Sequence, residues 1–304
     1  MTIAKQIVCL AYLGTALVAL PVPVFAHSTK PSQPAANSNR ESDFDSEHLF
    51  GFTEGTDIGD KGDRELEWGT SGRLGKRFGS YAVFGSSIEG KFTVLDNFRI
   101  GPSAHFAFHA ISNVPGFEDR FVGALSELSF EMKHQVLDRH KAPFGLAFGF
   151  TPAIGMVDEM TGLPADVYGW SFLVMADREI IPRKLVGAVN VRYDAAVTRF
   201  RGTGLEERGS ELAISGAAST QLQPGVFIGG ELRYLRAYDG LVFNNFTGHA
   251  VFLGPTFYVK LSKESWIGGT WSMQVAGWAP AEPNGLDLQN FERHQFVVRF
   301  GRDF

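Results

Sequence analysis

The last fifteen residues of the chain, "NFERHQFVVRFGRDF" (290–304), alternate between two kinds of side chain with the two-residue period of an extended strand. One face of such a strand is apolar and carries Phe296, Val298, Phe300 and Phe304. The other face is mixed and carries Gln295, Val297, Arg299, Gly301 and Asp303. This pattern predicts a β-strand with one face in an apolar environment and the other among polar groups or water.

Eleven earlier segments show the same period, and turn-forming residues separate them. Together with the C-terminal segment they make twelve predicted strands: 64–76, 80–94, 96–111, 120–136, 143–156, 166–180, 184–198, 208–222, 225–238, 248–262, 265–278 and 290–304. Short connections such as "QPG" alternate with longer polar ones such as "DGLVFNNFTG". Short turns at one rim and long loops at the other are typical of bacterial outer-membrane barrels. The predicted fold is therefore an all-β, antiparallel transmembrane β-barrel of about twelve strands.

A soluble β-sandwich is the alternative, because its strands also alternate. Three features favour a lipid-exposed barrel over a soluble sandwich. The predicted strands are long against the usual ~5–6 residues, and a secretory signal and a terminal phenylalanine are present together. Aromatic residues near strand ends also predict interfacial girdles, at Tyr81, Trp170, Trp266 and Trp278.

The N-terminal region has a different composition. Residues 1–26 predict a cleaved secretory signal peptide, and a transmembrane anchor is the alternative that two prolines in the apolar stretch disfavour. Residues 27–52 are rich in serine, proline, asparagine and charge and predict a disordered periplasmic lead-in. This leaves 53–304 for the barrel. Cys9 is the only cysteine, so the mature protein is expected to have no disulfide and no thiol chemistry.

If the apolar rows face lipid, the opposite rows face the lumen. The predicted lumen-lining side chains are Glu65, Glu67, Arg73, Glu89, Lys91, Arg99, His105, His109, Glu127, Glu131, Lys133, Asn190, Arg192, Asp194, Glu211, Glu231, Arg233, Lys260 and Arg299. With histidine neutral, acids and bases balance. Such a set has two interpretations: a narrow polar pore with a weak ion or solute preference, or a paired network that fills the barrel. Small residues, Gly101, Gly145 and Ser215 among them, would leave space for the pore.

No sequence motif indicates a catalytic or metal-binding site. His105 and His109 lie on one predicted strand about 13 Å apart, too far for one metal ion without further ligands. The sequence shows no nucleophile elbow and no phosphate loop. We therefore expect no catalytic, cofactor-binding or metal-binding residue, no cofactor and no enzyme activity.

The predicted function is a porin-like channel for passive passage of small solutes, organic ones included, through a Gram-negative outer membrane. A structural or surface-interaction barrel with a plugged lumen is the first alternative, and an outer-membrane hydrolase is the second. The expected partners are outer-membrane lipids, the secretion and barrel-assembly machinery and the solute. A net charge of −5 without a basic stripe excludes nucleic acid as an expected partner.

Two resemblances support this prediction. The apolar row Phe296, Val298, Phe300 and Phe304 resembles the C-terminal assembly signal of outer-membrane barrels, although Arg302 departs from it. "TEGTDIGDKGDRELEW" (53–68) resembles the start of a proteobacterial outer-membrane barrel family named after the phenol-degradation meta pathway. That resemblance implies a transporter suspected in the uptake of small organic compounds, and it carries over no pocket residue.

Overall fold

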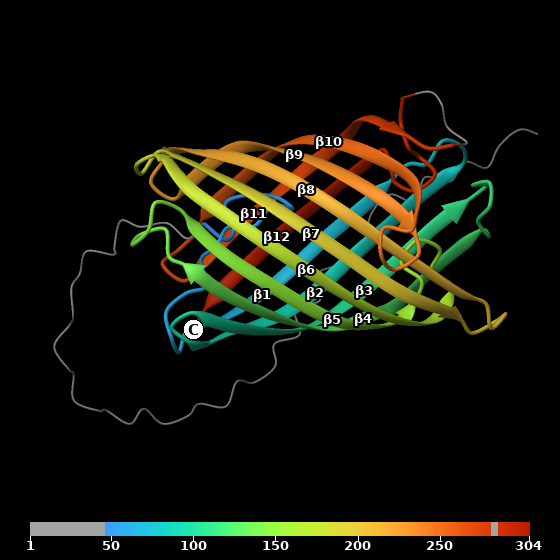
Figure 1. Ribbon diagram of the computed structural model, residues 1–304, viewed down its shortest axis with the longest axis horizontal. Helices are drawn as coiled ribbons and strands as arrows, with labels where there is room; N and C mark the ends of the chain where they lie inside the picture. The colour runs from blue at the N-terminus through green and yellow to red at the C-terminus, as the bar shows by residue number, and fades with distance from the viewer. Residues whose placement is uncertain (1–45, 281–284) are drawn as a thin grey trace, which may run out of the picture. The chain divides into compact units, whose positions relative to one another are not determined.

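A computed structural model describes residues 46–280 and 285–304. The expected signal peptide and residues 27–45 of the expected lead-in lie outside the described residues. Twelve antiparallel strands close into one barrel in which each strand pairs with its sequence neighbours and β1 pairs with β12 (Figure 1). The strands are β1 (Arg64–Leu74), β2 (Ser80–Leu95), β3 (Phe98–Ser112), β4 (Arg120–Leu137), β5 (Gly145–Val157), β6 (Pro164–Ile181), β7 (Leu185–Phe200), β8 (Glu206–Gln223), β9 (Val226–Asp239), β10 (Asn245–Lys260), β11 (Ser265–Trp278) and β12 (His294–Asp303). Within the described residues, no helix has the length and hydropathy needed to cross a membrane.

The predicted fold is confirmed, and most predicted strand ends lie within two residues of the observed ones. The largest difference is at the last strand, which begins at His294 rather than at residue 290. Phe291 and Glu292 are instead buried in the loop before it, where Phe291 packs against Phe252 of β10 and Glu292 lies 3.5 Å from the Lys76 ammonium. Tertiary contacts therefore take these residues out of the strand.

The two faces of the wall differ as the alternation predicts. Large apolar side chains such as Leu128, Phe130, Leu253 and Phe257 are exposed on the outer face, where a membrane barrel meets lipid. In β12, Phe300 lies on this outer face, whereas Arg299 points inward and donates to the carbonyl of Gly51 at 3.1 Å.

The predicted aromatic girdle is wrong at two of its four positions. Tyr81 is buried inside the barrel, where its hydroxyl donates to the Met160 carbonyl at 2.9 Å. Trp266 is buried as well, although Trp278 on the same strand is exposed. The two tryptophans have the same parity in sequence, but a register shift between β10 and β11 turns the end of β11 over.

The lead-in is not disordered over residues 46–52. Residues 46–58, here called the inserted segment, run inside the barrel ahead of β1. Leu49 and Phe50 are almost completely buried in a cluster with Val186, Phe227 and Trp266 of the wall. The apolar run at 49–52 folds because the barrel interior offers it a place to bury, which a lead-in in water would lack.

Candidate functional site in the barrel lumen

Aromatic packing holds the inserted segment against one side of the lumen. The His48 ring stacks on Trp266 of β11, with ring centroids 3.9 Å apart and an interplanar angle of 17°. The Phe52 ring lies under the Arg233 guanidinium of β9, at 3.7 Å from its central carbon. Ser219 donates to the Leu49 carbonyl at 2.9 Å. These contacts place the segment along β8, β9 and β11.

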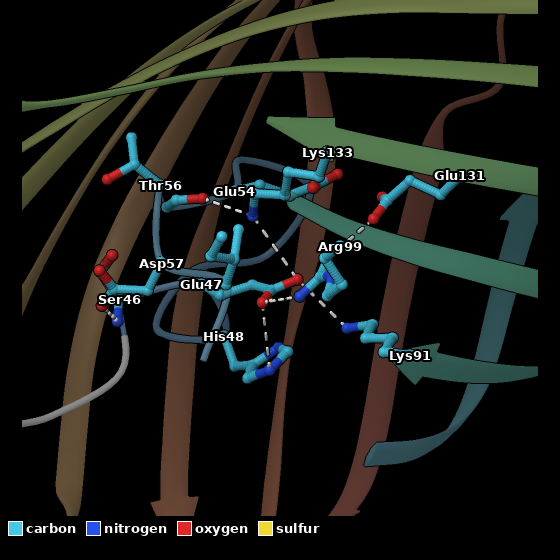
Figure 2. A network of polar contacts seen from close by, with 12 residues as sticks. Ser46, Glu47, His48, Glu54, Thr56, Asp57, Lys91, Arg99, Glu131 and Lys133 are labelled. Carbon is cyan, nitrogen blue, oxygen red and sulfur yellow. Dashed lines mark hydrogen bonds and ion pairs between the residues drawn. The ribbon is translucent and has the colours of Figure 1, made fainter. Parts of the chain in front are cut away.

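The Glu47 carboxylate is the centre of a buried charge cluster (Figure 2). Three cations from neighbouring strands converge on it: Lys91 of β2 at 3.2 Å, Lys133 of β4 at 3.6 Å, and Arg99 of β3, which donates directly to Oε2. Because strands β2, β3 and β4 are adjacent and the three side chains share the inward face, the fold itself brings these cations together.

A second layer of acids surrounds the three cations. Glu131 accepts a hydrogen bond from Arg99 at 2.8 Å, and Glu67 accepts one from Lys91 at 2.7 Å. Glu65 lies 3.9 Å from the same ammonium, and Glu67 is also 3.4 Å from Arg299. The cluster is thus a continuous network of alternating charge, in which Glu47 is the one carboxylate supplied by the inserted segment.

Burial and charge act on Glu47 in opposite directions. Burial raises the pKa of the Glu47 carboxyl, but the neighbouring cations Arg99, Lys133, Lys91 and His48 outweigh burial and hold this pKa well below its usual range. Glu47 is therefore ionised at neutral pH, and its attraction to the wall depends on that ionisation.

The middle of the inserted segment is fixed by wall side chains that bind its backbone. The Thr53 amide donates to Glu231 at 2.7 Å, and the Thr53 hydroxyl donates to Ser215 at 2.9 Å. Asn190 exchanges two hydrogen bonds with the backbone of Glu54, at 2.8 and 3.1 Å. These wall groups satisfy backbone donors and acceptors that would otherwise be buried without partners.

The end of the segment is held by Asp177 of β6, which accepts from the Thr56 amide at 3.1 Å and from its hydroxyl at 2.7 Å. Arg139 forms ion pairs with Asp57 at 2.8 Å and with Asp177 at 3.5 Å. A Cβ on Gly145 would overlap both the Thr56 hydroxyl and the Asp177 carboxylate. Gly145 therefore makes room for the inserted segment rather than leaving space for a pore.

The structure brings more than half of the predicted lumen residues to the inserted segment or to the charge cluster around it. These are Glu65, Glu67, Lys91, Arg99, Glu131, Lys133, Asn190, Arg192, Glu231, Arg233 and Arg299. Of the small residues expected to keep the lumen open, Ser215 binds Thr53, and Gly101 faces the Glu89 carboxylate.

Part of the lumen beside the inserted segment is more open. The partly exposed inward acids, here called the acidic wall, are Glu89, Glu127, Glu131, Asp194 and Glu211. Side-chain exposure is 39% for Glu127 and 35% for Arg192, which is large for groups inside a closed barrel. His105 lies within hydrogen-bond distance of Ser103 and Ser129. Space for water therefore remains beside the inserted segment.

The remaining predicted lumen residues lie towards the two ends of the barrel. Arg73 pairs with Glu159 at 2.6 Å, and His109 contacts the Glu159 carbonyl at 3.0 Å, so the loop between β5 and β6 folds over this end. Lys260, the last residue of β10, is exposed at the opposite end. His105 and His109 have separate partners, as their spacing predicts.

Sequence reasoning missed Glu47, His48, Arg139 and Asp177. Glu47 and His48 could have been found from the mixture of charged and large apolar residues at 47–52, because disordered segments contain few large apolar residues. Among the described residues, His48, Glu65 and Glu67 form the one group of three with metal-ligating atoms within 4.8 Å of one another. The Lys91 ammonium already occupies this group, 2.7 Å from Glu67, so a cation is present without a metal.

The fold and the site define the class of protein: a closed twelve-stranded barrel of the outer-membrane type, with an N-terminal segment bound inside its lumen. The chain belongs to a family of unknown function, DUF6662, whose model matches residues 42–304. No curated protein matches the sequence. The resemblance to the phenol-pathway barrel family stays a prediction, because the matching family model is this other one.

Solved structures share the fold. An outer membrane channel of the COG4313 group from Pseudomonas putida F1 superposes with a TM-score of 0.56 at 10% identity, covering 82% of this chain and 98% of that one. The beta domain of the Bordetella autotransporter BrkA superposes with a TM-score of 0.50 at 14% identity, covering 81% of this chain and 100% of that one. At these identities the likeness shows an outer-membrane barrel fold.

Proposed function

We propose that this protein is an outer-membrane channel for small solutes, in which the inserted segment narrows the lumen. The observation that carries the proposal is the partial exposure of inward-facing Glu127 and Arg192 beside that segment. Side chains in a filled barrel pack against one another, whereas these two face space large enough for water. The similar fold of an outer membrane channel also supports this function.

The acidic wall gives this narrow path a charge preference. Arg73, Arg192 and Arg299 are the partly exposed inward bases, and each is paired with an acid. Within the described part of the chain, Glu89, Asp194 and Glu211 form no ion pair with a base. While the segment is inserted, the path therefore favours cations over anions.

A plugged structural barrel is the second candidate function, and the density of contacts around the inserted segment favours it. Hydrogen bonds and ion pairs tie residues 47–58 to β1 through β4, to β6 through β9 and to β12, over the whole width of the lumen. The two candidates differ in one property: whether ions cross the inserted, correctly folded barrel.

An introduced disulfide can separate the two candidates. Thr53 and Ser215 have hydroxyl oxygens 2.9 Å apart, so Thr53→Cys with Ser215→Cys should lock the segment to β8. Ser103 and Ser129 are cross-strand partners with hydroxyl oxygens 2.6 Å apart, and the corresponding double cysteine variant is the matched control within the wall. Cys9, the only native cysteine, is replaced by serine in both.

Single-channel current in a planar bilayer is the measurement. We expect a small steady current from the oxidised Thr53–Ser215 variant, larger events after reduction, and no effect of oxidation in the control. A barrel that shows the heat-modifiable gel shift of a folded β-barrel but passes no current, oxidised or reduced, would support the plugged candidate. Equal currents before and after reduction would show that the segment is not the constriction.

A further inference from the structure

The wall of the lumen carries a ready-made site for one carboxylate. Lys91, Arg99 and Lys133 hold their charged ends within contact of the Glu47 carboxylate, and their side chains are only 6%, 3% and 1% exposed. All three belong to the wall, whereas the carboxylate belongs to the inserted segment. The three cations therefore belong to the barrel whether or not the inserted segment occupies the lumen.

The charges around the Glu47 carboxylate favour an anion at its position. With Glu47 present, the bases Lys91, Arg99, Lys133 and Arg299 balance the acids Glu47, Glu65, Glu67 and Glu131. Without Glu47, the four bases keep only three of these acids as ion-pair partners, and Lys133 is left with none. A buried cation without a counter-charge is costly, so the vacant site attracts a single negative charge.

Lys133 depends most on this anion. Within the described residues, its ammonium has polar partners only on the inserted segment, the Glu47 carboxylate at 3.6 Å and the Gly55 carbonyl at 2.9 Å. Arg99 keeps Glu131 when the segment leaves, and Lys91 keeps Glu67. Arg99 also has a buried Nε without a hydrogen-bond partner, which is a further donor for an incoming carboxylate.

We propose that Lys91, Arg99 and Lys133 form a binding site for the carboxylate of a small organic acid, and that Glu47 fills this site as a built-in competitor. The inference rests on the proposed channel function and names its solute class. A solute carboxylate that reaches the site takes the place of Glu47 and so favours withdrawal of the inserted segment. Glu89 points inward two residues before Lys91, and its charge opposes anion binding.

Chemical replacement of the Glu47 side chain tests the site. Glu47→Ala removes one methylene and the carboxylate, and these are the heavy atoms of acetate. Glu54→Ala is the matched control, because it removes a carboxylate from the same segment, paired with Arg192 at 2.8 Å, and leaves Glu47 in place. Binding of sodium acetate to the detergent-solubilised, full barrel is measured by calorimetry in a buffer without carboxylate, with neutral acetamide as the ligand control.

We expect saturable acetate binding by Glu47→Ala, no binding of acetamide, and no acetate binding by wild type or Glu54→Ala. Adding Lys133→Gln to Glu47→Ala should abolish binding, and adding Glu89→Gln should tighten it. Equal acetate binding by Glu47→Ala and Glu54→Ala, or none by either folded variant, would overturn the site. Calorimetry does not depend on current, so a variant that binds acetate in a barrel without conductance would refute the channel and keep the site.

Discussion

Replacing Glu47 with glutamine should release the inserted segment more than any other single change of charge within it. The change keeps the size of the side chain but removes the carboxylate from three buried cations. Removing one partner of a buried ion pair costs about 3–5 kcal/mol. Because Arg99 and Lys91 keep Glu131 and Glu67, the lower end of this range applies.

This cost falls on the inserted state alone, since withdrawal lets water or solute reach the cations. At about 1.4 kcal/mol for each factor of ten, the ratio of inserted to withdrawn barrels should fall about a hundredfold. Thr53 is completely buried in the inserted state, so a cysteine at this position reports withdrawal through its rate of reaction with a water-soluble maleimide. Glu47→Gln should therefore speed the labelling of Thr53→Cys about a hundredfold.

Glu54→Gln is the control for this experiment. Its partner Arg192 is 35% exposed, and a partly hydrated pair of this kind contributes about 1 kcal/mol or less. Labelling should then rise about fivefold at most. Equal acceleration by the two variants would refute the assignment of Glu47 as the main electrostatic anchor, and so would unchanged labelling in Glu47→Gln.

Three further predictions follow from the same geometry. Because the inserted state lowers the pKa of Glu47, the stability that Glu47 contributes is complete above its ordinary pKa of about 4.3 and is lost as pH falls through the lower value. Labelling of Thr53→Cys, divided by the labelling rate of free cysteine at the same pH, should therefore rise below about pH 4 when Glu47 is present and rise less in Glu47→Gln. Gly145→Val places atoms where the Thr56 hydroxyl lies, so it should release the end of the segment and raise the labelling rate, while an unchanged rate would show that the wall can shift to accept the side chain. Glu127→Gln removes a half-exposed charge worth about 1 kcal/mol or less, so the cation-to-anion permeability ratio from reversal potentials should fall less than about fivefold, and a ratio that stays the same would place the ion path elsewhere.

The strands were readable from the sequence because a strand's pattern is local. In β12 the apolar side chains of Phe296, Val298 and Phe300 alternate with Gln295 and Arg299, and the pleat alone assigns them to opposite faces. The same reasoning failed where contacts with a distant part of the chain determine whether a residue belongs to a strand. Residues 290–293 belonged to the predicted strand, but Phe291 and Glu292 lie in a loop, held by contacts with β10 and with Lys76.

By itself, then, the sequence determined the number of strands, their order and the alternation that divides side chains between the two faces of the wall. Only the tertiary structure decided what those charges meet. Alternation says that Arg99 and Lys133 point inward, but it cannot say that Glu47, which precedes them by 52 residues and more, fills the space between them. The reason is physical: the period of a strand is fixed by its own backbone, whereas the occupant of a lumen is fixed by which buried charges and apolar groups of the whole chain can satisfy one another.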